Sequence, residues 1–295
     1  MNNYHESVLV KEVLEGLHVK KASKYIDATL GTGGHALAIV KEGGIVLGVE
    51  TDSEILDLSN KRFTEEKIDK KSYKFVKGNF DKIGDFAKEE GFTEVSGIIF
   101  DLGVSNIHLK NQTRGFSFEN PDALLDMRLD TESSGVKASD LLNVLREDQL
   151  RELFEVTLNP GAAMWLSKKI VKYRVGSPIL TVGGFINACK GLKTEKVGLN
   201  PATLPFLALR IAVNSELTNL KETLPKAFDL LKTEGRLLVI SFHSKEDAIV
   251  KEYFKSLVTD GKAVAITYKP LVPGESEVFE NRKSRSAKLR IVEKI

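Results

Sequence analysis

The stretch YIDATLGTGGHALAIVKEGGIVLGVE, residues 25–50, decides the fold. Its first apolar run is typical of a buried strand, and a glycine-rich loop at residues 31–34 leads from that run into a segment with helical character. A second apolar run follows and ends in Glu50. A strand, a glycine loop, a helix and a second strand in this order predict a βαβ unit with a ligand site at the loop.

The glycine loop and Glu50 together favour a nucleoside-containing cofactor. Glycines allow the backbone to approach a ligand closely, and the helix that follows offers unpaired N–H groups and a positive dipole end. Glu50 lies 19 residues after Gly31, where a carboxylate can accept hydrogen bonds from both ribose hydroxyls. The series Gly31-x-Gly33-x-x-Ala36 also satisfies the dinucleotide fingerprint, so an NAD-dependent dehydrogenase is an alternative.

The rest of the chain continues the α/β pattern on both sides of a different segment. Alternating strands and helices predict a mainly parallel sheet, and the last two strands fit an antiparallel pair at its edge. Strands are expected at residues 25–30, 45–50, 73–77, 95–101, 236–242, 264–269 and 288–293, and helices at 36–42, 53–62, 81–90, 206–220 and 244–255. A dinucleotide fold would repeat a second mononucleotide half, whereas five parallel strands and an edge hairpin are the layout of S-adenosylmethionine-dependent methyltransferases.

The segment between the two α/β parts has no comparable strand pattern. Leu166, Ile170 and Tyr173 recur at helical spacing, with lysines on another face. The sequence therefore predicts a mostly helical inserted domain at residues 107–200, between two parts of one α/β core at residues 1–106 and 201–295.

Composition is that of a soluble globular protein, but the charge is unevenly distributed. The 295 residues include 43 basic and 41 acidic ones, a net charge of +2, and this balance excludes a disordered, collagen-like or coiled-coil chain. Residues 161–200 alone carry a net charge of +6. Lys168, Lys169 and Lys172 are expected in one helix of this range, and Glu195 and Lys196 lie near the end of the range. Such an excess is typical of a surface that binds a polyanion, although solvated lysines give the same pattern.

Cysteine and metal chemistry are not expected, and neither is a membrane segment. The single cysteine, Cys189, lies in an apolar stretch and excludes an intramolecular disulfide, and no metal-ligand spacing occurs. No apolar run reaches the roughly 18 residues that a membrane helix needs, and the N-terminus has no signal-peptide pattern. We therefore expect a cytoplasmic protein without a metal.

Two further strand ends carry candidate catalytic groups. Asp101 ends the fourth predicted strand, at the sheet edge where ligands of α/β proteins bind, so it can contact the cofactor or hold an amine substrate. His243 follows the fifth strand at the same edge, and Ser244 is expected to cap the next helix there. A covalent cysteine mechanism is poorly supported, which favours an exocyclic nitrogen over a ring carbon as the methyl acceptor.

Ordered motifs over nearly the whole chain resemble those of the MraW (RsmH) family of bacterial ribosomal RNA cytosine-N4 methyltransferases. They are His5-x-Ser-Val-Leu9, Asp27-x-Thr-x-Gly-x-Gly33-Gly34-His35, Asn79-Phe80, Asp101-Leu-Gly-Val-Ser105, Arg114-Gly-Phe-Ser-Phe118, Leu125-Asp126-Met-Arg128-Leu-Asp130, Ala208-Leu-Arg210-Ile-x-Val-Asn214-x-Glu216-Leu, Gly235 to Asp247 and Ser284-Arg-Ser-Ala-Lys-Leu-Arg290. The resemblance implies a Rossmann-like class I methyltransferase fold with a helical insertion. It also implies S-adenosylmethionine as cofactor and, as substrate, N4 of cytidine 1402 in the decoding region of 16S ribosomal RNA.

Site residues follow from the resemblance position by position. The cofactor would be held by Gly33, Gly34, His35, Glu50, Phe80, Asp101 and His108. The substrate would be held by Arg114, Asp126, Arg128, Asn214, Glu216 and Ser241, with Asp101 and His243 as the candidate catalytic groups. If the target base is flipped from its stack, Phe116 and Phe118 are candidate stacking surfaces, or else ordinary core.

The chain departs from the family pattern at several positions. Glu50 stands where the family has Asp, His108 where it has Gln, and Leu204 and Leu207 where it has polar residues. A noncatalytic or retargeted RNA-binding relative is therefore a second alternative. The expected partner is ribosomal RNA, within the small ribosomal subunit, and a homodimer is one possible oligomeric state.

Overall fold

The structure is a computed structural model that describes residues 4, 7–132, 135–193 and 200–295. His5, Glu195 and Lys196 lie outside these ranges. The described chain divides into two units, one made of residues 1–105 and 217–295 and the other of residues 106–216.

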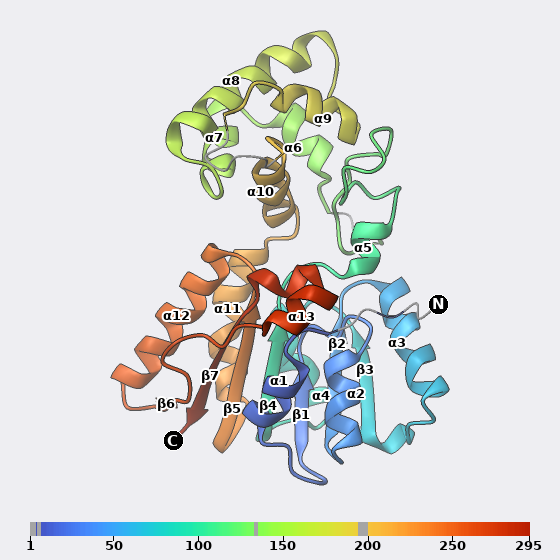
Figure 1. Ribbon diagram of the computed structural model, residues 1–295, viewed down its shortest axis with the longest axis vertical. Coiled ribbons are helices and arrows are strands. Elements are labelled where there is room, and N and C mark those ends of the chain that lie inside the picture. Colours follow the sequence, from blue (N-terminus) through green and yellow to red (C-terminus); the bar gives the residue numbers. More distant parts are fainter. Residues whose placement is uncertain (1–3, 5–6, 133–134, 194–199) are drawn as a thin grey trace. The chain divides into compact units, whose positions relative to one another are not determined.

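The first unit is built on a seven-stranded sheet (Figure 1) with the order β3-β2-β1-β4-β5-β7-β6. The strands are β1 (Lys24–Asp27), β2 (Ile45–Glu50), β3 (Tyr73–Lys77), β4 (Val95–Asp101), β5 (Leu231–Ser241), β6 (Ala263–Ala265) and β7 (Lys288–Lys294). The first five are parallel, while β7 runs antiparallel to both β5 and β6. In the centre, Ile26 of β1 pairs with Leu47 of β2 and Ile98 of β4.

Helices cover both faces of this sheet. They are α1 (Val10–Leu17), α2 (Gly34–Lys41), α3 (Ser53–Glu65), α4 (Ile83–Glu89), α11 (Glu216–Asp229) and α12 (Ser244–Thr259). The same unit contains α13 (Glu275–Glu280), which buries no residue, and short 3-10 turns at Lys70–Ser72, Phe80–Lys82 and Arg282–Ser286. Alternate residues of β4 point to opposite faces. Ile98 and Phe100 pack with α4, α11 and α12, whereas Ile99 packs with α1, α2 and α3. Burial on both faces explains the continuous apolar runs of the central strands.

This topology confirms the predicted α/β class and the Rossmann-like methyltransferase fold. A dinucleotide-binding sheet has a second mononucleotide half with parallel strands in the order 3-2-1-4-5-6. Here the antiparallel β7 lies between β5 and β6, as the predicted edge pair requires. The arrangement therefore argues against the dehydrogenase alternative.

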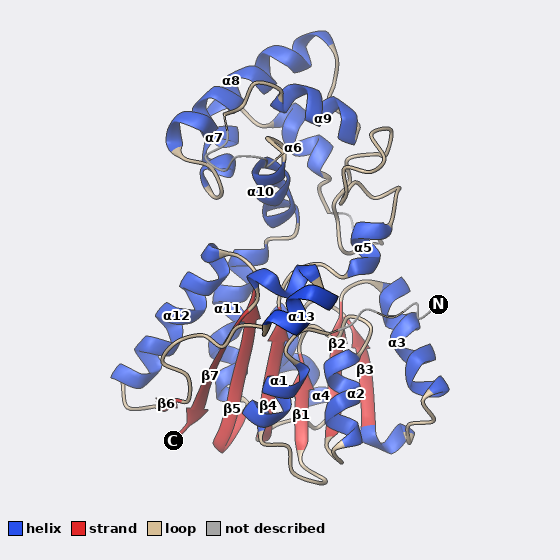
Figure 2. Cartoon of the chain, viewed as in Figure 1, coloured by secondary structure: helices blue, strands red, loops and turns tan. Residues whose placement is uncertain are grey.

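The second unit is mostly helical (Figure 2), with helices α5 (Asn106–Lys110), α6 (Ala138–Val144), α7 (Glu147–Glu155), α8 (Pro160–Gly176), α9 (Val182–Cys189) and α10 (Thr203–Val213). Its core is aromatic. The ring of Phe185 stacks on Phe154 at a centroid distance of 6.3 Å and lies 5.2 Å from Phe206, which in turn meets Phe118 edge-on at 4.4 Å. Fully buried Leu166 and Ile170 line the inner face of α8.

Several expectations differ from the structure. The strands expected at residues 25–30, 236–242 and 264–269 are Lys24–Asp27, Leu231–Ser241 and Ala263–Ala265. The single helix expected at residues 206–220 is two helices, because Ser215 adopts a positive φ of 51° and interrupts the helix between α10 and α11. The inserted unit accordingly ends at Glu216 rather than at residue 200, since Phe206 of α10 packs into its aromatic core. Tyr173, expected on the buried face of α8, is exposed near the end of that helix.

Candidate functional site

The glycine loop has a backbone that side chains would disturb. Gly33 has a φ of +76° and forms the N-cap of α2, and Gly31 is also left-handed, with a φ of +53°. A Cβ atom on Gly33 would lie 2.8 Å from Cε2 of Phe63, a fully buried ring in α3. The loop is therefore a close-packed turn that presents backbone N–H groups at the start of α2.

Glu50 ends β2 and holds this loop from the side. Its Oε2 accepts the N–H of Gly31 and its Oε1 accepts the N–H of Asp52, both at 2.9 Å. Each carboxylate oxygen has a further lone pair, so ribose hydroxyls still find acceptors here. Desolvation by burial raises the pKa of Glu50 to about 7, against the effect of these N–H groups.

Two acids and a histidine form a buried cluster beside the loop. Asp27 is 1% exposed and His35 3% exposed, and Nε2 of His35 lies 3.4 Å from Oδ2 of Asp101. Burial alone would lower the pKa of His35, but the hydrogen bond and charge of Asp101 and the charge of Asp27 outweigh it and raise that pKa. Burial raises the pKa of Asp27 to about 6.

This cluster contains buried acceptors that the protein leaves open. Among the described residues, Oδ2 of Asp27 and Oδ1 of Asp101 have no hydrogen-bond partner. Buried polar atoms without partners are uncommon and call for a ligand or water. Open carboxylate acceptors next to a glycine loop suit the ammonium group and hydroxyls of a nucleoside cofactor, and an amine substrate, so the residues fit the expected ligand.

Three more predicted residues, Phe80, Ser241 and His243, lie at or just after the ends of parallel strands, at the same edge of the sheet. Phe80 follows β3, and its ring meets Phe100 edge-on at 5.6 Å. Ser241 is buried at the end of β5. His243, not Ser244, caps α12: its Nδ1 accepts the N–H of Glu246 at 3.3 Å, and its Nε2 lies 3.2 Å from Oε1 of Glu246. The expected Ser244 cap was wrong by one residue, because an imidazole nitrogen replaces the usual hydroxyl acceptor.

Five of the six candidate substrate residues belong to the inserted unit, and four of them build or hold one loop. Arg128 pairs with Asp126 through two contacts of 2.7 and 2.9 Å, and Arg114 donates to the carbonyl groups of Arg128 and Leu129 at 2.6 and 2.8 Å. Asn214 accepts the N–H of Leu129 at 2.9 Å. These contacts fix the loop at residues 125–130 from two sides, so four of the predicted side chains build or hold that loop.

The remaining residues of this unit have structural contacts as well. Glu216 forms a two-contact ion pair with Arg210, at 2.8 and 3.0 Å. His108 is buried, with its ring 5.2 Å from the buried Phe116. Phe118 packs against Phe206. Both phenylalanines thus have the core contacts that were the alternative to base stacking.

Cys189 is not equipped as a nucleophile. It is 1% exposed at the end of α9, and burial raises the pKa of its thiol to about 12. We expect Cys189→Ser to leave methyl transfer within about twofold of wild type and to lower the melting temperature, because a hydroxyl replaces sulfur in an apolar site. Single-turnover assays and thermal melts measure both. A folded variant with no turnover would contradict a noncovalent mechanism.

None of the described helices is long and apolar enough to cross a membrane.

The predicted site residues leave out Asp27, Ser7 and Glu277. Ser7 lies against Gly34, and the charges of Asp27 and Glu277 act on His35. Asp27 carried a signal, since it is an acid at the end of the first strand, whereas the other two act through contacts between distant segments.

Comparison with known proteins identifies similar chains over the full length. A family model described as the MraW methylase family matches residues 2–295. A protein named ribosomal RNA small subunit methyltransferase H from Methylacidiphilum infernorum is 41% identical, over 99% of this chain and 94% of its own. Proteins of the same name from Fusobacterium nucleatum and Clostridioides difficile are 37% and 35% identical, over 100% of this chain and 98% and 100% of theirs.

Proposed function

The chain belongs to the MraW methylase family, and from this premise we propose that it transfers the methyl group of S-adenosylmethionine to N4 of a cytidine in small-subunit ribosomal RNA. The relatives are named as methyltransferases of that RNA. The finer assignment, to cytidine 1402 in the decoding region, follows the resemblance of the motifs.

The half-buried Asp101, with its buried and open Oδ1, is the observation that carries this proposal. Its open Oδ1 lies at the carboxyl end of β4, while Oδ2 faces His35. An exocyclic amine has two N–H groups, so the carboxylate of Asp101 can hold one of them while the nitrogen lone pair attacks, and it can accept the proton that this nitrogen loses as its bond to the methyl carbon forms. S-adenosylmethionine supplies an activated methyl group when it is bound.

The other residues orient the reactants and hold charge. Nε2 of His35 lies 3.4 Å from Oδ2 of Asp101, so Oδ1 is left for the amine. The backbone N–H of Asp101 donates to Oγ1 of Thr29 at 2.6 Å, and this bond fixes the strand end. Preorganised groups of this kind supply much of the catalysis in enzymes.

The product identifies the reaction. Small-subunit particles that lack the modification would be incubated with protein and S-adenosylmethionine, and their nucleosides analysed by mass spectrometry. We expect N4-methylcytidine. Finding 5-methylcytidine would contradict the proposal. Binding of cofactor and RNA without any methylated product would favour the noncatalytic alternative, which rests on Leu204 and Leu207 in place of polar residues.

Cofactor affinity should depend on pH through Glu50. The carboxylate must be ionised to accept two ribose hydroxyls, and in the free protein its pKa is about 7. We expect affinity to rise with pH up to about 7, by as much as tenfold per unit, and to level off above 8. Glu50→Gln should bind about 10- to 100-fold more weakly with no such dependence, because its amide presents a donor to a backbone N–H. Calorimetry between pH 5.5 and 8.5 measures this.

Stability of the ligand-free protein should change in the opposite sense. The folded pKa of Glu50 lies above its ordinary value of 4.5, so its contribution to stability is full below pH 4.5 and is lost as the pH rises through 7. A ligand-free protein that gains stability over this range, with an affinity that does not change with pH, would contradict the assignment of Glu50.

RNA binding by the inserted unit can be tested through its lysines. Lys168 and Lys172 are exposed and four residues apart on α8, whereas Lys169 lies over the ring of Trp165 and donates to the carbonyl of Lys190. Each phosphate contact contributes about 0.7 to 0.9 to the slope of log affinity against log salt. We expect Lys168→Gln with Lys172→Gln to flatten that slope by about 1.4 to 1.8.

A matched control comes from the first unit. Lys20 and Lys21 are exposed before β1, at the amino ends of the parallel strands. Changing both to Gln should leave the slope unaltered, as should the cofactor affinity of either double variant. Equal slopes for wild type and the α8 variant would mean that the RNA lies elsewhere, with residues 282–290 as the next candidate.

A further inference from the structure

The segment just before α1 packs on the glycine loop. We call residues 7–9 the N-terminal strap. Val8 and Leu9 are each 1% exposed and belong to the same apolar cluster as Leu30 and Ala36, which flank the loop. The strap therefore packs in the apolar cluster beside the glycine loop, although α1 and β1 separate the strap from the loop in the sequence.

Ser7 occupies the space in which Gly34 would otherwise carry a side chain. A Cβ atom on Gly34 would lie 2.0 Å from Oγ and 2.9 Å from Cβ of Ser7. Gly34 has an ordinary helical φ, so its lack of a side chain reflects this contact and not backbone strain. The strap thus touches the first residue of α2.

Glu277 holds the other end of the strap. Its Oε1 accepts the N–H of Leu9 at 2.8 Å, across 268 residues of sequence. Leu9 is the N-cap of α1, has a positive φ of 55° and makes no side-chain cap of its own. A non-glycine residue in this conformation costs about 1 kcal/mol and is kept there by its surroundings, so the carboxylate of α13 acts as the missing cap.

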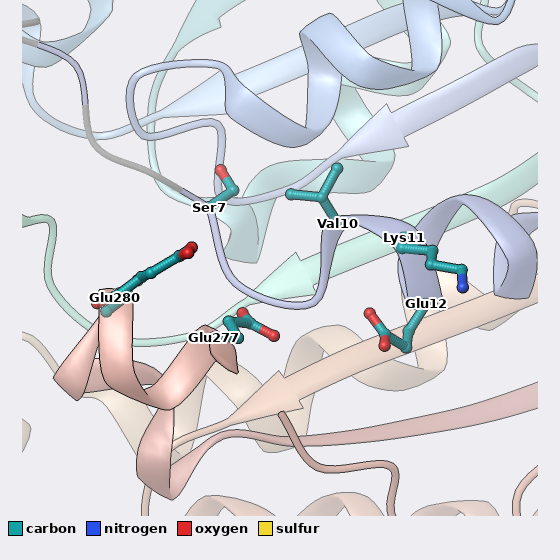
Figure 3. A pocket seen from close by; sticks show the side chains of 7 residues that line it. Ser7, Val10, Lys11, Glu12, Glu277 and Glu280 are labelled. Carbon is teal, nitrogen blue, oxygen red and sulfur yellow. The ribbon is translucent and has the colours of Figure 1, made fainter. Parts of the chain in front are cut away.

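The surroundings of Glu277 are acidic (Figure 3). A cavity of about 290 Å³ is lined by Ser7, Val10, Lys11, Glu12, Glu277, Glu280 and Asn281. In Figure 3, the Glu280 side chain points toward Ser7 and that of Glu12 toward Glu277. The charge of Glu277 also contributes to the raised pKa of His35, which follows Gly34. The strap therefore contacts the start of α2 through Ser7 and α13 through Leu9.

We propose that Glu277 is a positioning residue that presses the strap against Gly34 and so sets how long an S-adenosyl ligand stays in the glycine loop. The inference rests on the proposed function for the identity of the ligand. Loss of the carboxylate frees Leu9, the strap withdraws from Gly34, and the start of α2 loosens around the bound ligand. The dissociation rate then rises more than the association rate changes.

Stopped-flow binding of S-adenosylmethionine and S-adenosylhomocysteine tests this. We expect Glu277→Ala to raise the dissociation rate about tenfold, the scale of a lost hydrogen bond to a charged group. Glu277→Gln should behave as wild type, since its amide oxygen still accepts the N–H of Leu9. Glu275→Ala, an exposed residue of the same helix, is the matched control and should also behave as wild type.

A size-compensating pair separates the strap from a direct effect on the ligand. Gly34→Ala should raise the dissociation rate, and adding Ser7→Gly should restore it, because the two atoms that the new Cβ meets are then gone. Hydrogen exchange of the ligand-free protein should show faster exchange at Leu9 in Glu277→Ala but not in Glu277→Gln.

The outcomes are distinct. Wild-type rates in Glu277→Ala, or no rescue of Gly34→Ala by Ser7→Gly, would overturn the role of the strap while leaving the proposed function intact. A wild-type protein that binds neither S-adenosyl ligand would overturn the proposed function and this inference with it.

Discussion

Gly33→Val should lower the affinity for S-adenosylmethionine by at least about 100-fold. Valine is branched at Cβ and strained at a φ of +76°, and its Cβ would meet the buried ring of Phe63 at 2.8 Å. Either the loop or α3 must move, and a loop that moves no longer aims its N–H groups at the ligand. Calorimetry measures the affinity, and circular dichroism with thermal melts reports whether the variant folds.

Two further variants keep this prediction testable if Gly33→Val fails to fold. Gly33→Ala has the same positive φ with less bulk, so it should fold and still bind more than tenfold more weakly. Gly84→Val in α4 is the matched control, because a Cβ there meets no atom within 4 Å and the backbone has an ordinary φ. Affinity within a few-fold of wild type in a folded Gly33 variant would refute the cofactor loop.

The sheet could be predicted closely because its strands carry their own signals. The structure has β2, β3 and β4 with the bounds expected from sequence, Ile45–Glu50, Tyr73–Lys77 and Val95–Asp101. Each is an apolar or alternating run between polar segments, and burial on both faces makes that run continuous. Strand ends then placed Glu50 and Asp101 at one edge without any tertiary information.

The break between α10 and α11 could not be predicted in the same way. The apolar periodicity of residues 206–220 continues through Asn214 and Ser215, and neither residue type stops a helix reliably. The break depends on Asn214, whose side chain bonds to Met127 and Leu129 across more than 80 residues. Likewise, the contact of Glu277 with Leu9 joins the two ends of the chain, and local sequence carries no sign of it.

Asp101 is the residue on which turnover should depend most. The swap Asp101→Asn preserves size, and the bond from its backbone N–H to Thr29 does not involve the side chain, so the strand end should keep its structure. An N–H at Nε2 of His35 pairs with the carbonyl oxygen of the new amide, which takes the place of Oδ2. The amide NH2 group then occupies the position of the open Oδ1 and presents donors to the donors of the cytosine amine.

We therefore expect Asp101→Asn to lower kcat about 100- to 10,000-fold, the range for losing a positioned acceptor in the transition state. Asp27→Asn provides the matched comparison, because Asp27 faces His35 from β1 and loses the same charge there. It should lower kcat less than about tenfold, since in the proposed mechanism it does not touch the amine. Single-turnover methylation of small-subunit particles at saturating cofactor measures both variants, and calorimetry shows that the cofactor is bound. If kcat of Asp101→Asn stays within a few-fold of wild type, or if Asp27→Asn loses as much, the amine is held by another group and the assignment of Asp101 is wrong.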